Sequence, residues 1–172
     1  METEALTVAV VMQRTAIANR WQPYAWKPIE LSIGIPIQGE PVRCLRSEEA
    51  DTRWLFGGFD VRLYTDEAEG YFLNIDSAVP CWFIMWRIEE IDGAEVAVPK
   101  QVTLSYNEAA RLMDGGERVD TLPAPAEIIE HLRRFVEQHY RPEPKKKRRK
   151  PSFEGGAGVA QMASEEGKAH GS

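Results

Sequence analysis

Alternation of apolar and polar side chains along the first hundred residues restricts the possible fold more than any other feature of this chain. Apolar and charged residues alternate over Phe59–Leu63, as in a strand with one face in solvent. In the run 82–89, one face begins with Phe83 and Met85 before it becomes charged, so we expect cover on both sides of that strand at its start. The other face is apolar throughout and consists of Trp82, Ile84, Trp86 and Ile88.

The dipeptide Asp92-Gly93 follows this run and predicts a hairpin. A type I′ turn needs a positive φ at both central residues, and Asp-Gly between two apolar runs meets that need. Residues 95–104 should return as the antiparallel partner. Pro99 has no N–H to give to a ladder, so it predicts an edge or a bulge.

The other strands make about seven in total. The acidic segment 66–70 has the composition of a turn, which predicts a second hairpin, and Gly57-Gly58 predicts a kink or bulge. Mostly short connections favour a mainly antiparallel sheet that is curled, or closed into a barrel or sandwich. The remaining predicted strands are Leu6–Gln13, Tyr24–Ile33, Val42–Leu45, Phe59–Tyr64 and Tyr71–Asp76.

Two helices are predicted late in the chain, which makes the fold class α+β, mainly β. Ser105 and Glu108 have the spacing of a capping box before a short helix over about 106–113, and Gly115 suits a left-handed C-cap. A second helix over about 125–140 is amphipathic and should dock on the sheet. Its stripe consists of Ile128, Ile129, Leu132, Phe135, Val136 and His139.

The composition changes abruptly after Tyr140. Residues 1–140 hold 13 Lys and Arg against 23 Asp and Glu, a net charge of −10, whereas residues 141–172 hold 8 against 4, a net charge of +4. The later segment has no apolar face to offset the entropy of ordering. We therefore predict a single β-rich domain over 1–140 and a disordered, basic-then-polar tail over 141–172.

Several features favour a soluble cytoplasmic protein. No stretch approaches the roughly 18–20 uninterrupted apolar residues of a membrane span. The N-terminus lacks the basic start of a secretory signal. Cys44 and Cys81 are typical of reduced thiols in a cytosolic protein rather than of a disulfide framework.

A basic run lies in the tail and consists of Lys145, Lys146, Lys147, Arg148, Arg149 and Lys150. Such a run binds phosphates, anionic lipids or an acidic protein surface, or it simply stays solvated. Nucleic acid is an unlikely ligand because the body of the chain is acidic and only Phe153 lies near the run to stack on bases.

Three aromatic residues, Trp21, Tyr24 and Trp26, cluster in a segment interrupted by Pro23 and Pro28. Tryptophan and tyrosine supply large anchoring areas at interfaces. Two readings are open: these side chains cover one end of the sheet as part of the core, or they form an exposed ledge for a protein partner.

The sequence contains no constellation typical of catalysis or metal binding, so we predict no enzyme activity and no cofactor. His131 and His139 are eight residues apart, about 12 Å along a helix, which is too far for one metal ion. Cys81 lies between Pro80 and Trp82 in an apolar context, where a thiol is not activated.

Three pairs of stretches resemble a family of short proteobacterial proteins of unknown function, which are often encoded beside molybdenum-dependent formate dehydrogenase genes. The likeness covers roughly residues 5–151. It implies a bacterial cytoplasm and a part in the assembly or regulation of a redox enzyme, and it assigns no catalytic residue. The stretches are Val10–Arg14 with Asn19–Gln22, Asp66–Asn74 with Trp82–Arg87, and Val102–Arg111 with Met113–Glu117.

Together these features predict a non-catalytic accessory or adaptor protein. Its partner would be a protein, such as the formate dehydrogenase subunit or maturation factor that the resemblance implies, bound through the aromatic segment with the basic run as a steering element. Two alternatives stay open: a β-barrel that holds a small ligand against Trp82 and Trp86, and weak nucleic-acid binding through Lys145–Lys150. The sequence predicts no particular oligomeric state.

Overall fold

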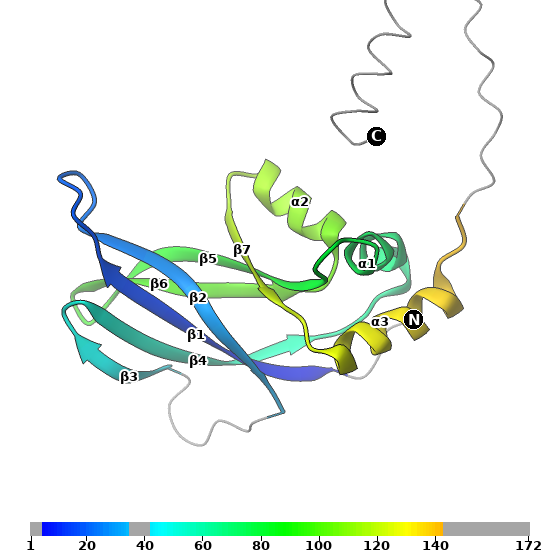
Figure 1. Ribbon diagram of the computed structural model, residues 1–172, viewed down its shortest axis with the longest axis horizontal. Helices are drawn as coiled ribbons and strands as arrows, with labels where there is room; N and C mark the ends of the chain where they lie inside the picture. Colours follow the sequence, from blue (N-terminus) through cyan, green and yellow to red (C-terminus); the bar gives the residue numbers. More distant parts are fainter. Residues whose placement is uncertain (1–4, 35–41, 143–172) are drawn as a thin grey trace, which may run out of the picture. The chain divides into compact units, whose positions relative to one another are not determined.

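The structure is a computed structural model that describes residues 5–34 and 42–142 (Figure 1). These residues form a mainly β, α+β fold, as predicted. The elements in chain order are β1 (Leu6–Ala16), β2 (Tyr24–Ile33), β3 (Val42–Glu48), β4 (Asp51–Val61), the 3₁₀ turn η1 (Thr65–Glu67), α1 (Ala68–Ile75), β5 (Cys81–Ile91), β6 (Ala94–Thr103), α2 (Tyr106–Asp114), β7 (Arg118–Pro123) and α3 (Ala126–His139).

The strands form two antiparallel sheets that share one core. One sheet has the order β2-β1-β4-β3 and the other β6-β5-β7. The sheets meet where β2 contacts β7 and where β4 contacts β6. Figure 1 shows the three helices together at one end of the sheets, where α1 contacts both α2 and α3. The buried centre consists of Val8, Val10 and Met12 of β1 with Trp82, Ile84 and Trp86 of β5.

The predicted hairpin at Asp92-Gly93 is confirmed. Asp92 and Gly93 have φ values of 51° and 81°, as a type I′ turn requires, and they join β5 to β6. Pro99 lies on the edge strand β6, beside an irregularity in its register with β5. The bulge at Gly57-Gly58 is also present, because the register between β1 and β4 shifts there and Gly58 has a φ of 83°.

The predicted hairpin over 59–76 is wrong: of its first strand, Phe59–Tyr64, only Phe59–Val61 belong to a strand, the end of β4, and its second strand is absent. Residues 65–75 form η1 and α1 instead of a turn and a strand. Ala68, Tyr71 and Asn74 are buried at a spacing of three, which is the period of a helix face. Acidic Asp66 and Glu67 precede this helix, where negative charge complements the helix dipole.

The strand count of seven is confirmed because β7 replaces the predicted strand at 71–76. β7 pairs with β5 from Cys81 opposite Pro123 to Trp86 opposite Arg118. The sequence reading did not predict this strand. Residues 82–86 are buried on both faces of β5, as expected, since Phe83 packs edge-on against Tyr106 of α2 with ring centroids 6.3 Å apart.

Both predicted helices are present, with two local differences at α2. The Ser105 side chain accepts a hydrogen bond from the Glu108 N–H, as the capping box predicts, but the Ser105 N–H donates to Thr103 and not to Glu108. Gly116, with a φ of 88°, is the left-handed residue at the C-terminus of α2, whereas Gly115 has a φ of −78°. In α3 the stripe is buried at Ile128, Leu132, Phe135 and Val136, and it packs on α1.

Within the described residues, no helix has the length and apolar character needed to cross a membrane. The described helices and strands all fall within residues 1–140, the predicted domain. The predicted tail lies outside the described residues from 143 onward, and its disorder therefore stays a prediction.

Candidate functional site

The loop between β1 and β2 has a fixed conformation that exposes a tryptophan. The side-chain oxygen of Asn19 accepts hydrogen bonds from the N–H groups of Trp21 and Gln22, at 2.8 and 3.3 Å. The Ile17 N–H donates to the Pro23 carbonyl at 2.9 Å and closes the loop at its base. In Figure 1 this loop projects beyond the end of the four-stranded sheet. Trp21 is 84% exposed, the largest value among the exposed large hydrophobic residues of the described chain.

Below this loop the core face of β1 ends in an arginine that is surrounded by aromatic rings. Val10 and Met12 are buried, and Arg14 follows them on the same face because side chains in a strand alternate. The Arg14 guanidinium lies 4.1 Å from the ring centroid of Tyr24, 6.0 Å from Trp26 and 5.7 Å from Trp54. Cation–π attraction of this kind is worth about 0.5–2 kcal/mol.

The Arg14 side chain is only partly satisfied by hydrogen bonds. Its Nη2 donates to the Thr52 hydroxyl at 3.2 Å, but its buried Nε has no partner among the described residues. An unsatisfied buried donor costs about 1–3 kcal/mol, which the stacked rings offset in part. Arg14 therefore holds Tyr24 and Trp26 in place from below.

The two aromatic residues of β2 are fixed further by their neighbours. Trp26 packs on Trp54 with ring centroids 5.4 Å apart and an interplanar angle of 34°. The Tyr24 hydroxyl donates to Glu49 at 2.8 Å, and this hydrogen bond raises the pKa of Tyr24 above its usual value. Both residues are half-buried. We call Trp21, Tyr24 and Trp26 the aromatic end of the molecule.

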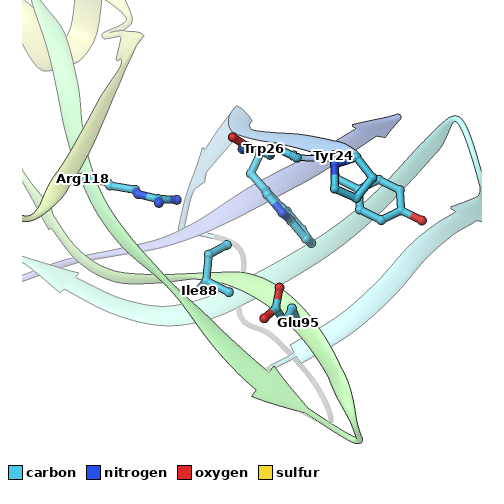
Figure 2. Close-up of a pocket in the computed structure, with 7 residues that line it drawn as sticks. Tyr24, Trp26, Ile88, Glu95 and Arg118 are labelled. Atoms are coloured by element: carbon cyan, nitrogen blue, oxygen red, sulfur yellow. The ribbon is translucent and has the colours of Figure 1, made fainter. Parts of the chain in front are cut away.

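A pocket of about 230 Å³ lies beside the aromatic end, between strands of both sheets (Figure 2). This volume is below the ~300–1,000 Å³ typical of pockets for whole drug-sized ligands, and it suits one large side chain. Arg118 and Glu95 approach the pocket from opposite sides of Ile88 in Figure 2. The lining residues are Gln22, Pro23, Tyr24, Trp26, Ile88, Glu95 and Arg118.

The two charged side chains of this pocket differ in their surroundings. The Arg118 guanidinium lies 5.0 Å from the ring centroid of Trp86, which holds it against the core. The Glu95 side chain is exposed at the start of the strand β6 and forms no ion pair or hydrogen bond with another described residue. Glu95 is therefore a negative charge that is available to a partner at the rim of the pocket.

The structure divides the predicted partner-binding residues into three groups. Trp21 is exposed, as expected for a ledge, whereas Tyr24 and Trp26 are half-buried and line a pocket, so the structure has features of both alternatives. The basic run Lys145–Lys150 lies outside the described residues. Arg14, Ile88, Glu95 and Arg118 were not predicted as site residues, and for the last three the reason is that strand pairing and not local sequence brings them to this place.

Trp82 and Trp86, the predicted contacts of a small ligand, are packed inside the core. They are 1% and 6% exposed, and the Trp86 indole N–H donates to Asp120 at 2.6 Å. Neither residue lines the pocket described above.

Chemically reactive side chains are dispersed in the described part of the chain. No three His, Cys, Asp or Glu side chains of residues 5–34 and 42–142 come close enough together to hold a metal ion. His139 packs on Phe135, with ring centroids 4.4 Å apart. Burial raises the pKa of the Cys81 thiol, which makes it a weak nucleophile at neutral pH.

A partly buried polar joint connects η1 and α1 to α2 and involves two of the stretches that carry the resemblance. The Ser105 hydroxyl donates to a Glu67 oxygen at 3.1 Å, and the same oxygen accepts from Arg111 at 2.6 Å. Gly70 lies directly below Ser105, and a Cβ at this position would fall 2.0 Å from the Ser105 hydroxyl oxygen. The polar groups of the joint form hydrogen bonds with one another, so we infer that the joint stabilises the fold.

Comparison with known proteins gives one match. Residues 7–149 match a protein family whose description is "protein of unknown function (DUF3305)". No curated protein and no solved structure matches the chain.

Proposed function

This chain belongs to the DUF3305 family of proteins of unknown function, and from that premise we propose that it is an accessory protein without catalytic activity, which binds a protein partner through its aromatic end. The observation that carries this proposal is Trp21. A tryptophan that is 84% exposed leaves a large apolar area in water, and such residues are over-represented among the side chains that dominate binding energies.

The surroundings of Trp21 support a docking role. The Asn19 hydrogen bonds fix the loop before a partner arrives, so little conformational entropy is lost on binding. The adjacent pocket offers a recess for a side chain of the partner, in which Trp26 and Ile88 give apolar contacts and the rest of the wall, including Glu95, is mainly polar. An apolar anchor inside a polar rim is the usual composition of a protein interface.

The resemblance described above extends the proposal to a class of partner. We expect a proteobacterial, cytoplasmic protein that assists the assembly or regulation of a molybdenum-dependent formate dehydrogenase, with a subunit or a maturation factor of that enzyme as the partner. The basic run Lys145–Lys150 would steer the complex towards an acidic region of the partner.

Affinity capture from the native host tests this proposal. The tagged full chain should retain a formate dehydrogenase subunit or maturation factor, identified by mass spectrometry, and Trp21→Ala should reduce the retained amount at least tenfold. Val79→Ala is the matched control, since Val79 is 60% exposed but precedes the opposite end of β5. Absence of any such protein from the wild-type eluate, or equal retention by Trp21→Ala, would refute the proposal.

We do not propose the two alternative functions that the sequence left open, small-ligand binding and nucleic-acid binding. Trp82 and Trp86 are packed in the core, and the net charge of −10 on residues 1–140 repels a polyanion. No observation on the described residues favours a small ligand at these tryptophans or a nucleic acid.

A further inference from the structure

The aromatic end combines an exposed side chain and a recess of matching size in a single surface patch. From this combination we infer that its partner in the free protein is a second copy of this chain, with Trp21 of each copy inserted in the pocket of the other about a two-fold axis. This inference goes beyond the proposed function, because it names the occupant of the same surface in the absence of another partner.

The position of Trp21 relative to the pocket suits such a pairing. In a two-fold interface the same patch meets itself, so that if residue i contacts residue j, then j also contacts i. The patch must therefore contain both the inserted side chain and the recess. Trp21 is followed directly by Gln22 and Pro23, which line the pocket.

The pocket has room for an indole ring and offers it aromatic contacts within a wall that is mainly polar. The pocket measures about 230 Å³, which is room for one large side chain and too little for a whole drug-sized ligand. Its walls include the rings of Tyr24 and Trp26, the Pro23 ring and the Ile88 side chain. Aromatic pairs add about 0.5–1.5 kcal/mol beyond the burial of their area, so an indole is a favourable occupant.

Charge complementarity points to the same occupant. The Arg20 guanidinium lies 5.0 Å from the ring centroid of Trp21, so a positive charge accompanies the indole into the recess. Glu95 stands at the rim of that recess, and neither it nor Arg20 forms an ion pair with another described residue. The two-fold operation therefore brings Arg20 of each copy towards Glu95 of the other, and the interface contains this pair twice.

Electrostatic repulsion between the two copies opposes self-association. Residues 1–140 of each copy carry a net charge of −10, and two such bodies repel each other. At an ionic strength of about 0.15 M the Debye length is about 8 Å, which screens the distant charges more than the close Arg20–Glu95 pairs. Dimerisation should therefore be measured at this ionic strength.

Sedimentation equilibrium of the full chain is the test. The wild type should show a reversible dimer with twice the monomer mass of 19.5 kDa. Trp21→Ala should raise the dimer dissociation constant at least tenfold, and Val79→Ala should leave it unchanged. Circular dichroism of each variant verifies that the two sheets are intact, since Trp21 is outside the core.

A charge exchange makes the test specific for the proposed pairing. Arg20→Glu and Glu95→Arg should each weaken the dimer at least tenfold, and the double variant should recover most of the loss because the pair is restored with reversed signs. A monomeric wild type at concentrations up to about 1 mM, a dimer insensitive to Trp21→Ala, or a double variant as weak as its parents would each overturn the inference.

The outcomes also separate this inference from the proposed function. A monomeric chain that captures a formate dehydrogenase component through Trp21 would refute the dimer and leave the proposed function in place. A dimer that obeys the charge exchange, from a chain that captures no such component, would support the dimer and refute the proposed function.

Discussion

At the scale of single residues, Asn74 shows how one buried side chain joins three elements. Its side-chain amide donates to the carbonyls of Cys81 and Leu104, at 2.8 and 2.9 Å, and its oxygen accepts from the Cys81 N–H at 3.0 Å. Asn74 is only 1% exposed, so water does not compete for these groups. It therefore ties α1 to the start of β5 and to the chain just after β6.

Replacement of this residue should be among the most damaging single changes in the fold. Asn74→Ala leaves one N–H and two carbonyls without their partner, and each unsatisfied buried group costs about 1–3 kcal/mol. We expect urea unfolding to show a loss of at least ~3 kcal/mol. Asn107→Ala is the control, since its amide bonds only to the exposed Glu69 side chain. A loss below ~1 kcal/mol for Asn74→Ala would contradict the assignment.

The aromatic end shows which site residues a sequence can reveal. Trp21, Tyr24 and Trp26 are close along the chain, so their density alone identifies them as candidates. Arg14 was also accessible in principle, because the alternation of Val8, Val10 and Met12 places it on the core face of β1. Glu95 and Arg118 come from other strands, and only the pairing of β5 with β6 and β7 brings them to the pocket.

At the scale of secondary-structure elements, the sequence predicts the helices and strands whose local hydrophobic pattern agrees with the way they pack in the fold. β5, its hairpin and α3 have a clear period of two or 3.6 and were predicted within a few residues. The segment 65–76 has acidic residues and a glycine at its start, as a turn has, but its buried residues Ala68, Tyr71 and Asn74 follow a helical period. Short segments with few apolar residues do not decide between the two periods, and packing decides for them.

β7 was missed for a related reason. Its six residues alternate only weakly between exposed and half-buried positions, so they carry little of the hydrophobic pattern that predicts a strand. Pairing with the fully buried segment of β5 stabilises β7, and this long-range contact is not visible locally.

The contact of α1 with α2 depends on a close approach that only glycine permits. In Gly70→Ala the new Cβ would lie 2.0 Å from the Ser105 hydroxyl oxygen and 3.0 Å from its Cβ, so the two helices must separate. Alanine gains up to ~1 kcal/mol of helix propensity, but overpacking costs about 1–3 kcal/mol, and the hydrogen bond from Ser105 to Glu67 is also strained. We expect a lower midpoint of thermal unfolding.

Gly115→Ala provides the matched control for this prediction. Gly115 also belongs to this region, but its φ is −78° and the nearest atom to an added Cβ is 3.4 Å away, an ordinary contact. The control should therefore melt within about 2 °C of the wild type. A Gly70→Ala protein as stable as the control would show that the α1–α2 contact is adaptable, contrary to this prediction.

At the scale of the whole molecule, structure and charge are divided between two parts of the chain. The described helices and strands, and the core they enclose, all precede residue 141. The negative charge is concentrated in the same part, whereas six consecutive basic residues follow at 145–150. Under the proposed function, a basic segment that follows an acidic body in the sequence would act on the approach of a partner through long-range attraction, and the contacts at Trp21 would determine how long the complex lasts.

Removal of residues 143–172 should therefore slow the association with the partner and leave the thermal stability and the dissociation rate constant unchanged. The midpoint of thermal unfolding should stay within about 2 °C of the wild type, because the core of the described residues lies entirely before the truncation. With the formate dehydrogenase component captured from the native host, the association rate constant at ~20 mM salt should fall about tenfold. At ~200 mM salt the difference should nearly vanish, because the Debye length is then shorter than the distances over which steering acts.

A second truncation separates charge from length. Removal of residues 151–172 deletes most of the same segment but keeps the run Lys145–Lys150, so this protein should associate at the wild-type rate. Stopped-flow kinetics of both truncations give the two rate constants separately. Equal slowing of both proteins would mean that the basic run does not steer the partner. If the protein without residues 143–172 dissociates faster than the wild type, the tail itself contacts the bound partner. That result would contradict the assignment of the dissociation rate to the contacts at Trp21.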